Sequence, residues 1–448
     1  MDHRAPRPRR ILLLTATLGL LALVHAAPAG AQSTASALGA EIDRRATEVQ
    51  PRVVAWRRDI HQNPELSNRE TRTAGIVAAH LRSLGMEVRT GVAHTGVVGI
   101  LRGGRPGPVV ALRADMDALP VTEQVDLPFR SRVRSTYNGQ EVGVMHACGH
   151  DLHTAMLMGV AQVLAGMRER IPGTVKFIFQ PAEEGPPPGE EGGARLMIRE
   201  GVLRDPRPGA IFGVHVWPQP AGTLHYRELG TMASADNLTI IVRGRQTHGA
   251  VPWGGVDPIV VGAQIVTALQ TIPSRQVNVT LAPSIVTIGS FQGGVRTNII
   301  PDSVVMLGTV RAFDPAMRRD IHERIRRTAE MIAASAGATA RVTLQEGAPV
   351  TYNDPALTAR MVPTLRRVAG EERVAVSLPI TAAEDFGYYQ QEIPGMFFFL
   401  GIVPEGQDPA KAPANHSPHF FADEGALPVG VRAMAHLAVD YLTGQGGR

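Results

Sequence analysis

Short apolar runs typical of buried strands alternate with segments of helical periodicity along most of this chain, and this alternation constrains the fold most strongly. The strand-like runs are residues 97–101, 109–113, 174–179, 210–214 and 396–401. The helical segments are residues 41–61, 70–84, 152–167, 194–199 and 426–442. Strands that alternate with helices predict an α/β fold in which helices flank a mostly parallel central sheet.

The middle of the chain follows another order: strand, helix, strand, strand, helix, strand. Its segments are residues 236–242, 259–272, 277–288, 303–310, 317–336 and 341–344. This order predicts a small α+β domain with a four-stranded sheet and two helices. We therefore expect residues 233–345 to form a domain inserted into a larger one, which would consist of residues 32–232 and 346–448.

The first 31 residues have the pattern of a secretory leader. Four arginines precede an uncharged apolar run at residues 11–24, and Ala29-Gly30-Ala31 follows. This pattern predicts a signal peptide cleaved after Ala31, and so a periplasmic or secreted protein. The apolar run is shorter than the about 20 residues that a membrane span needs. The pair Arg9-Arg10 leaves both the general secretory and the twin-arginine route open.

The net charge gives no reason to expect nucleic acid or an anionic membrane as a partner. The whole chain has a formal charge of +4, and residues 1–31 hold four arginines and one aspartate, which is +3 of it. Without them the charge would be close to +1. We therefore expect a small-molecule substrate rather than a polyanion.

Cys148 is the single cysteine of the chain, so no internal disulfide can form. It lies in the run His-Ala-Cys-Gly-His-Asp of residues 146–151, and His153 follows closely. Thiolate, imidazole and carboxylate are the ligands of a divalent transition metal. A lone cysteine can equally be a small buried hydrophobic residue, because free cysteine is among the most buried residue types.

Further candidate ligands follow the ends of predicted strands. They are Asp115 and Asp117 after residues 109–113, Glu183 and Glu184 after residues 174–179, and His215 after residues 210–214. Open α/β sheets bind ligands beyond the carboxyl ends of their strands, so these side chains could converge on one crevice. Each also has a simpler explanation, because paired acids form turns and helix caps and a histidine after a strand is often a hydrogen-bonded core residue.

Together with Cys148, these residues favour a two-metal hydrolase, in which paired ions acidify a water and polarise the scissile carbonyl. In an adjacent pair of glutamates, Glu184 can bind metal while Glu183 acts as general base. His416 or His419, near the C-terminus, is a candidate last ligand. Two other classes stay open: a hydrolase with Cys148 as nucleophile, and a non-catalytic periplasmic binding protein, which would not need a general base.

Longer motifs carry a resemblance to a known family. They are Arg-Ala-Asp-Met-Asp-Ala-Leu-Pro at 113–120, His-Ala-Cys-Gly-His-Asp at 146–151, Pro-Ala-Glu-Glu-Gly at 181–185, and residues 58–65, 213–215, 247–252, 298–302, 383–386 and 416–418. In this order they resemble the co-catalytic metallopeptidase family of aminoacylases and glutamate-type carboxypeptidases. Because a cysteine occupies position 148, the motifs resemble in particular the branch of hippurate hydrolases and auxin-conjugate amidohydrolases within this family.

The resemblance implies that Cys148 bridges two divalent metal ions per subunit, manganese or zinc. The other implied roles are metal ligand for His150, Glu184, His215 and His416, general base for Glu183, ligand positioning for Asp117, oxyanion stabilisation for His248, and substrate binding for His248, Asn298 and Arg311. His153 and Glu384 would lie behind the ligands, and for His153 a purely structural role fits as well. The inserted domain would be a lid through which the chain forms a homodimer or higher homo-oligomer, and His248 would reach a site across that interface.

The resemblance thus implies an exported metal-dependent amidohydrolase that acts on N-acyl or N-aroyl amino acids such as hippurate-like conjugates. A dipeptidase or carboxypeptidase of the same family needs the same metals and base, so it stays an alternative. Two departures from relatives concern substrate contacts: Trp253 stands where a histidine is frequent, and residues 186–191 are inserted after the acidic pair.

Overall fold

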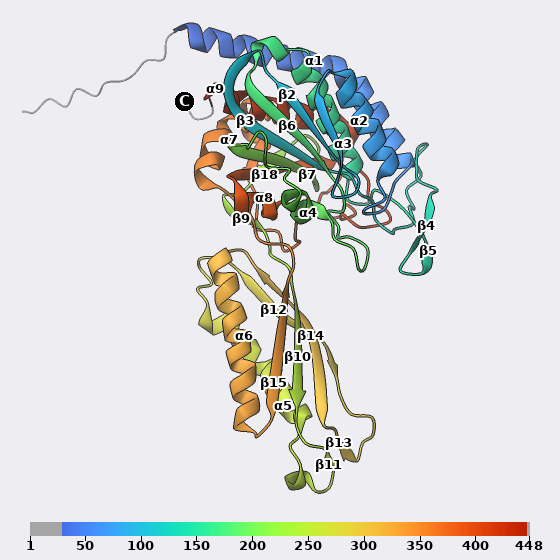
Figure 1. The fold of residues 1–448 in the computed structure, drawn as a ribbon, viewed down its shortest axis with the longest axis vertical. Helices are drawn as coiled ribbons and strands as arrows, with labels where there is room; N and C mark the ends of the chain where they lie inside the picture. The colour runs from blue at the N-terminus through green and yellow to red at the C-terminus, as the bar shows by residue number, and fades with distance from the viewer. Residues whose placement is uncertain (1–28, 446–448) are drawn as a thin grey trace, which may run out of the picture.

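The computed structural model describes residues 29–445, and its two main sheets lie at opposite ends of an elongated molecule (Figure 1). The larger sheet has eight strands in the order β1-β2-β6-β3-β7-β18-β8-β17. At its centre, β6, β3, β7 and β18 are parallel neighbours, and antiparallel pairs occur toward the edges. The predicted α/β class with a mostly parallel central sheet is confirmed.

The strands of this sheet are buried on both faces at its centre. Their bounds are β1 (Glu87–Val92), β2 (Gly96–Arg102), β3 (Arg105–Asp115), β6 (Pro172–Gln180), β7 (Ala210–Pro220), β8 (Leu224–Tyr226), β17 (Val374–Val376) and β18 (Gly395–Val403). Every residue of β18 is buried, and in β6 only Pro172 is partly exposed. Near-continuous apolar strands of this kind occur where helices cover both faces of a sheet.

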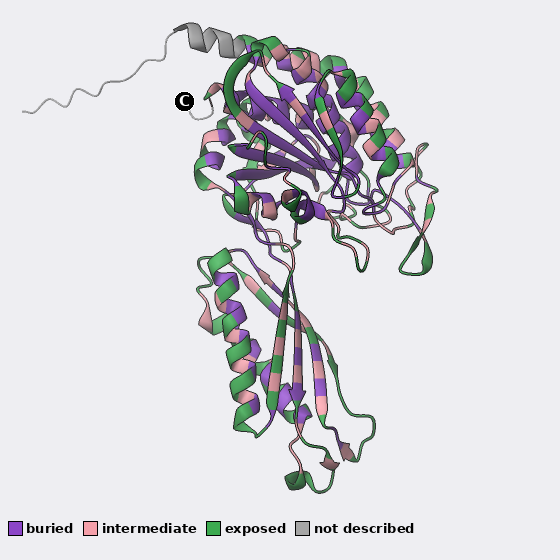
Figure 2. Ribbon diagram, viewed as in Figure 1, coloured by how far each residue is buried: buried purple, intermediate pink, exposed green. Residues whose placement is uncertain are grey.

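Helices pack against both faces (Figure 1). One face carries α1 (Ala29–Gln62), α2 (Thr71–Ser83), α3 (His150–Ala165), α7 (Pro355–Ala369) and α9 (Leu427–Thr443). The other carries the short helices α4 (Gly193–Arg199) and α8 (Gly387–Glu392). Because α3 is buried along nearly its whole length, its N-terminus lies deep inside the molecule. Figure 2 shows this burial.

The smaller sheet is antiparallel, in the order β12-β14-β10-β15. Its elements are β10 (Asp236–Arg243), α5 (Pro258–Leu269), β12 (Ser284–Gln292), β14 (Ser303–Ala312), α6 (Pro315–Ser335) and β15 (Thr339–Glu346). In β10, buried Leu238, Ile240 and Val242 alternate with more exposed residues, and the buried side chains pack against α5 and α6. The predicted four-stranded sheet with two helices is confirmed. The strand predicted at 277–288 begins only at Ser284, after Pro283, which has no N–H to donate.

The two sheets are connected by two chain segments that lie side by side. On the side of the larger sheet, β9 (Leu229–Met232) pairs with β16 (Thr351–Asn353), and on the other side β10 pairs with β15. Between these pairs, Ala235 N–H donates to Ala348 O at 2.9 Å and Gly347 N–H donates to Ala235 O at 3.0 Å. The two connecting segments are therefore joined to each other by backbone hydrogen bonds and are not two independent linkers.

Two small antiparallel pairs complete the fold. β4 (Arg134–Tyr137) and β5 (Gln140–Gly143) form a hairpin beside the larger sheet, and β11 (Thr247–His248) pairs with β13 (Ile299–Ile300) at the outer tip of the smaller sheet (Figure 1). Within the described residues, no helix combines the length and apolar character that crossing a bilayer requires.

The predicted periplasmic or secreted location is wrong. In the described structure no leader-like apolar helix is present, and α1 begins at Ala29 and runs as one helix through Ala31, after which cleavage was expected. The apolar run at residues 11–24 lies outside the described residues. Cleavage after Ala31 would cut into a helix whose later turns pack in the main core through Leu38, Ile42 and Val49.

Candidate metal centre

Cys148 and His150 lie on either side of Gly149. No other residue fits at this position unless neighbouring atoms move. Gly149 has a φ of 87°, and a Cβ placed on it would lie 2.2 Å from Cγ2 of Val216. This left-handed glycine precedes α3, so the chain turns sharply before the helix. The turn brings the Cys148 thiol and the His150 imidazole into the same buried group, together with His215 of β7.

The predicted metal ligands meet in three overlapping groups. In each group one ligand atom per residue lies within 4.8 Å of the others, and the groups are Cys148–His150–His215, Cys148–Glu184–His416 and His150–Glu183–Glu184. Cys148 Sγ lies 3.4 Å from Nε2 of His215, and Nε2 of His416 lies 2.9 Å from Oε1 of Glu184. The structure thus brings together all five residues that the sequence indicated as ligands.

The spacing of these atoms fits a divalent metal. Nε2 of His150 is buried without a hydrogen-bond partner, and it lies 3.8 Å from Glu183 Oε2 and 4.0 Å from Glu184 Oε1. Two ligand atoms that bind one tetrahedral ion at about 2.1 Å lie about 3.4 Å apart. Imidazole, thiolate and carboxylate are also the chemical set that such an ion prefers. A buried imidazole nitrogen facing carboxylates therefore has the environment of a metal ligand.

Asp117 positions the acidic pair Glu183–Glu184 relative to His150. Its Oδ1 accepts from the backbone N–H of Glu183, and its Oδ2 accepts from that of Glu184, both at 3.1 Å. Oδ1 also lies 3.3 Å from Nδ1 of His150, and the Ser67 hydroxyl donates to Oδ2 at 2.7 Å. One buried carboxylate thus fixes both the acidic pair and the imidazole.

His153 is fully hydrogen-bonded and is not available as a ligand. Its Nδ1–H donates to Asp115 Oδ1 at 2.6 Å, so its Nε2 accepts from the N–H of Val216 at 2.8 Å. His146 is buried outside the three groups, and burial lowers its pKa to about 3. Asp151 instead binds Arg57 and His61, each at 2.9 Å.

A buried arginine supports the centre from behind. Arg113 of β3 contacts Asp115 at 2.6 Å, Glu384 at 2.9 Å and Asp385 at 3.1 Å. Arg113 thus supplies a positive charge to two members of the acidic group Glu183–Glu384–Asp385. Glu384, expected behind the ligands, pairs with Arg113 in the structure.

Without a further cation, the electrostatics of the centre favour protonated groups. Burial, followed by the charges of Glu384 and Glu184, raises the pKa of Glu183 well above its usual range. Burial likewise raises the pKa of the Cys148 thiol, with Glu184 and Glu183 adding to the effect. Burial opposes protonation of His150, yet Asp115 and Asp117 raise its pKa to about 10. Bound divalent cations would reverse this preference, because metal ligands are deprotonated.

The predicted residues of the smaller sheet do not join this centre within one chain. His248 lies in β11 and Asn298 lies next to β13, at the tip farthest from the larger sheet (Figure 1). His248 is exposed, and its Nδ1 accepts from the N–H of Ala250 at 3.0 Å. Arg311 lies near the opposite end of β14, close to the connecting segments.

Glu70 and Asn415, like Ser67, support the centre and were not predicted from the sequence. Glu70 accepts from the N–H of Ala182 at 2.9 Å and so supports the turn that carries the acidic pair, where Ala182 has a φ of 52°. Asn415 donates to Cys148 O at 3.2 Å. Glu70 reads in the sequence as an acidic residue at a helix start, and only its buried position distinguishes it. Asn415 precedes His416 in its loop, which was a usable signal.

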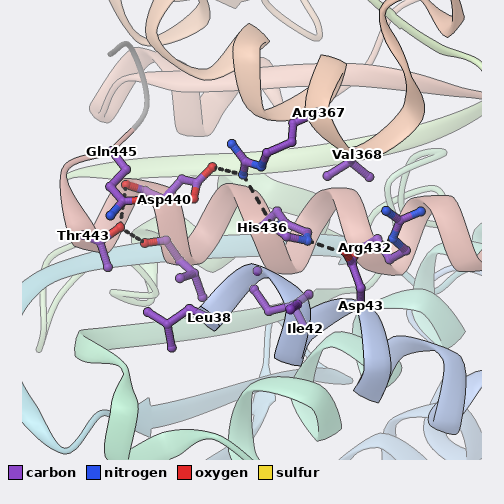
Figure 3. Close-up of a pocket in the computed structure, with 13 residues that line it drawn as sticks. Leu38, Ile42, Asp43, Arg367, Val368, Arg432, His436, Asp440, Thr443 and Gln445 are labelled. Atoms are coloured by element: carbon purple, nitrogen blue, oxygen red, sulfur yellow. Dashed lines mark hydrogen bonds and ion pairs between the residues drawn. The ribbon is translucent and has the colours of Figure 1, made fainter. Parts of the chain in front are cut away.

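A separate cavity of about 510 Å³ lies between α1, α7 and α9, and none of the candidate ligands lines it (Figure 3). Its charged side chains bind one another: Asp43 pairs with Arg432 at 2.7 Å and with His436 at 3.0 Å, and Arg367 pairs with Asp440 at 2.5 Å. Because these charges are already compensated, the cavity offers no reactive group, and the metal centre remains the candidate active site.

Comparison with known proteins agrees with this assignment. The model of peptidase family M20/M25/M40 matches residues 111–440. Thermostable carboxypeptidase 2 of Saccharolobus solfataricus is 40% identical over 397 residues, 88% of this chain and 96% of its own. IAA-amino acid hydrolase ILR1-like 4 of Arabidopsis thaliana is 38% identical over 395 residues, 87% of this chain and 86% of its own. The Bacillus subtilis YXEP protein, described as a dinuclear metal binding peptidase, has a TM-score of 0.72 at 36% identity and covers 88% of this chain and 99% of its own.

Proposed function

This chain belongs to peptidase family M20/M25/M40 and is a metal-dependent hydrolase of amide bonds, and we propose from that premise that its substrates are N-acyl and N-aroyl amino acids. Hydrolysis would release a carboxylate and a free amino acid. The observation that carries the proposal is the convergence of Cys148, His150, Glu184, His215 and His416 in overlapping groups, together with the buried, unpaired Nε2 of His150. Glu183, the other carboxylate of the acidic pair, lies beside them. The resemblance to an IAA-amino acid hydrolase supports the acyl-amino-acid class.

The proposed roles follow from where the side chains lie. Cys148, His150, Glu184, His215 and His416 would together hold two divalent metals. Zinc suits the cysteine and histidine ligands, and manganese is the alternative. When bound, the metals would acidify the attacking water and polarise the scissile carbonyl.

Glu183 is suited to move the proton. Its Oε2 lies 3.8 Å from His150 Nε2, so its carboxylate lies beside the proposed metal ligands. The backbone N–H of Asp385 donates to Glu183 Oε1 at 3.4 Å, which leaves the other oxygen to accept the proton. Glu183 would take a proton from the water during attack and return it to the leaving amine.

A second copy of the chain would complete the site. His248 and Asn298 lie at the tip of the smaller sheet, so we propose that they serve the metal centre of a partner subunit. We take residues 233–345 as the lid domain that makes this contact. Its strand β12 is an edge strand, and Ile285 and Phe291 on it and Val260 on α5 are exposed by 39% or more. An exposed apolar edge of this kind is typical of an interface.

The direct test is a substrate panel with N-acyl amino acids and dipeptides, each assayed in the presence of chelator and after addition of zinc or manganese. We expect turnover of the N-acyl amino acids to stop with chelator and to return with metal. Preference for dipeptides would support the alternative, an exopeptidase. The similarity to a relative named a carboxypeptidase favours this alternative. Activity that survives exhaustive chelation would contradict both and would point to Cys148 as a nucleophile.

A further inference from the structure

A small cavity opens beside Glu184, and we propose that it binds the acyl group of the substrate. This inference rests on the proposed function and deepens it. The cavity has a volume of about 220 Å³ and lies between the loop after β3, the β4–β5 hairpin and the inserted loop at residues 186–191. Its apolar walls include Leu66, Leu119, Tyr137 and Pro187.

The size of the cavity suits one group of a substrate. Binding sites for a whole small ligand measure about 300–1,000 Å³, so a space of 220 Å³ holds a fragment rather than the entire molecule. Because Glu184 lines the cavity and also belongs to the metal centre, a group seated there would be joined to the carbonyl that reacts. In an acyl amino acid that carbonyl carries two branches, the acyl chain and the amino acid.

The charges of the cavity select the acyl branch. Only two of its lining residues are acidic or basic, Arg69 and Glu184. The Arg69 guanidinium contacts Glu190 at 2.5 Å, and Glu184 contacts His416 at 2.9 Å. Arg69, the one basic residue among the lining residues, is thus already paired with Glu190, so the cavity offers no unpaired cation to a carboxylate. The amino acid carries its side chain and carboxylate on the same carbon, whereas the acyl chain is uncharged and apolar.

The inserted loop at residues 186–191 forms one wall of the cavity, and hydrogen bonds and an ion pair fix its position. Asn68 Nδ2 donates to Glu190 Oε2 and to Glu191 O, both at 3.0 Å, and Glu191 pairs with Arg199 at 2.5 Å. Pro187 and Pro188 line the cavity from this loop, and proline restricts the backbone. A preformed wall loses little entropy on binding, so the insertion should set acyl preference rather than merely cover the site.

The experiment compares N-acetyl, N-butyryl and N-octanoyl derivatives of one amino acid, with the metal-loaded full-length protein. We expect kcat/KM of the wild-type protein to rise with acyl length until the cavity is filled, by about fourfold per buried methylene. Leu119→Ala should lower kcat/KM for the octanoyl substrate by about tenfold, and Pro187→Ala should lower it in the same direction. In both variants, the loss of kcat/KM should be larger for the octanoyl substrate than for the acetyl substrate, because the longer chain makes more contact with these walls.

Arg134→Ala is the matched control. Arg134 lies on the same hairpin, pairs with Glu141 at 3.0 Å and does not line the cavity, so this variant should behave as wild type with every substrate. Pro187→Ala lies in a surface loop and keeps the test valid if Leu119→Ala does not fold.

The outcomes separate the inference from the proposed function. Hydrolysis of no N-acyl amino acid by the metal-loaded wild type would refute the proposed function itself. Hydrolysis that does not depend on acyl length would overturn the acyl assignment alone. The acyl assignment would also be overturned if the cavity variants changed the preference among amino acids while the preference among acyl groups stayed constant.

Discussion

Asp117 Oδ1 lies 3.3 Å from Nδ1 of His150, and the same carboxylate accepts the backbone N–H groups of the adjacent glutamates at 3.1 Å. Orientation of the imidazole and of the acidic pair is therefore coupled through one buried side chain. Asp117→Asn should weaken metal binding by about 10–100-fold, because an amide offers one acceptor oxygen in place of two. Competition with a chelator measures the affinity, and unchanged metal affinity in a folded variant would contradict the coupling.

Glu183→Ala should separate metal binding from turnover. We expect this variant to retain its metal content, because five other side chains supply the ligands, and to lose about 10²–10⁴-fold or more in kcat as the proton transfer is removed. Elemental analysis and a turnover assay on the same preparation measure both quantities. Glu372→Ala, at an exposed position of the short 3-10 helix Glu371–Arg373 that follows α7, is the control for loss of a carboxylate alone. Near-normal turnover by Glu183→Ala would refute its role as base.

Removal of metal should change the reactivity of Cys148. We expect the metal-loaded protein to resist a thiol reagent, because the thiolate would be bound and the side chain is 6% exposed. After the metal is stripped, the single thiol of the chain should react and further metal binding should be blocked. A colorimetric thiol count before and after chelation follows the change. Equal reaction in both states would argue against Cys148 as a ligand.

Complementation tests the shared active site. His248→Ala and Glu183→Ala should each be inactive, yet their co-expression should restore about a quarter of wild-type specific activity. Half of randomly formed dimers contain one chain of each kind, and one of their two sites then has both an intact Glu183 and an intact His248 from the partner. Activity that stays at background in purified mixed dimers would show that His248 acts within its own chain.

An ion-pair cluster near the connecting segments predicts a pH dependence of stability. Asp236 of β10 is buried and contacts His322 at 2.8 Å and Arg318 of α6 through a second oxygen. Burial opposes ionisation, but His322 and Arg318 lower the pKa of Asp236 below its usual value. A lowered carboxyl pKa stabilises the folded state above the unfolded pKa of about 4, and this contribution is lost as the pH falls toward the folded pKa.

Asp236→Asn should therefore be less stable than wild type at neutral pH, by about 2–4 kcal/mol, since it leaves Arg318 buried without its charged partner. The difference should begin to shrink below about pH 4, where the carboxyl of the unfolded chain becomes protonated, and should be lost as the pH falls through the lower pKa of the folded state. Denaturant unfolding across this pH range provides the measurement. A difference that stays constant on acidification would exclude the ion pair as its source.

Residues that carry a sequence pattern were predicted well, and residues defined by tertiary contacts were not. The buried strands β6 and β18 are continuous apolar runs, and the ligands follow strands or open α3, so their convergence could be inferred. The strands of three or four residues, such as β8 and β17, are too short to show periodicity. Helix α7 was missed because Pro363 lies inside it.

The same limit applies to the site. Glu70, which supports the turn at Ala182, has a neighbour far away in the chain that no local pattern reveals. The location was predicted wrongly because a basic and apolar beginning was taken as a leader, whereas α1 runs through the expected cleavage point as one helix. The positions of His248 and Asn298 could not be placed relative to the centre, because residue spacing does not indicate how a sheet is oriented.

Because the smaller sheet is attached to the larger one at its inner end, by the two hydrogen-bonded connecting segments, a small rotation there moves its outer tip over a longer distance (Figure 1). Its strand β10 has eight residues and so spans about 26 Å from the connection to the tip that bears His248. A rotation of roughly 10° at residues 233–235 and 347–350 would carry that tip through about 5 Å, which exceeds the reach of a hydrogen bond. Minor repacking around Ala235 and Gly347 would thus be enough to engage or withdraw the distant imidazole.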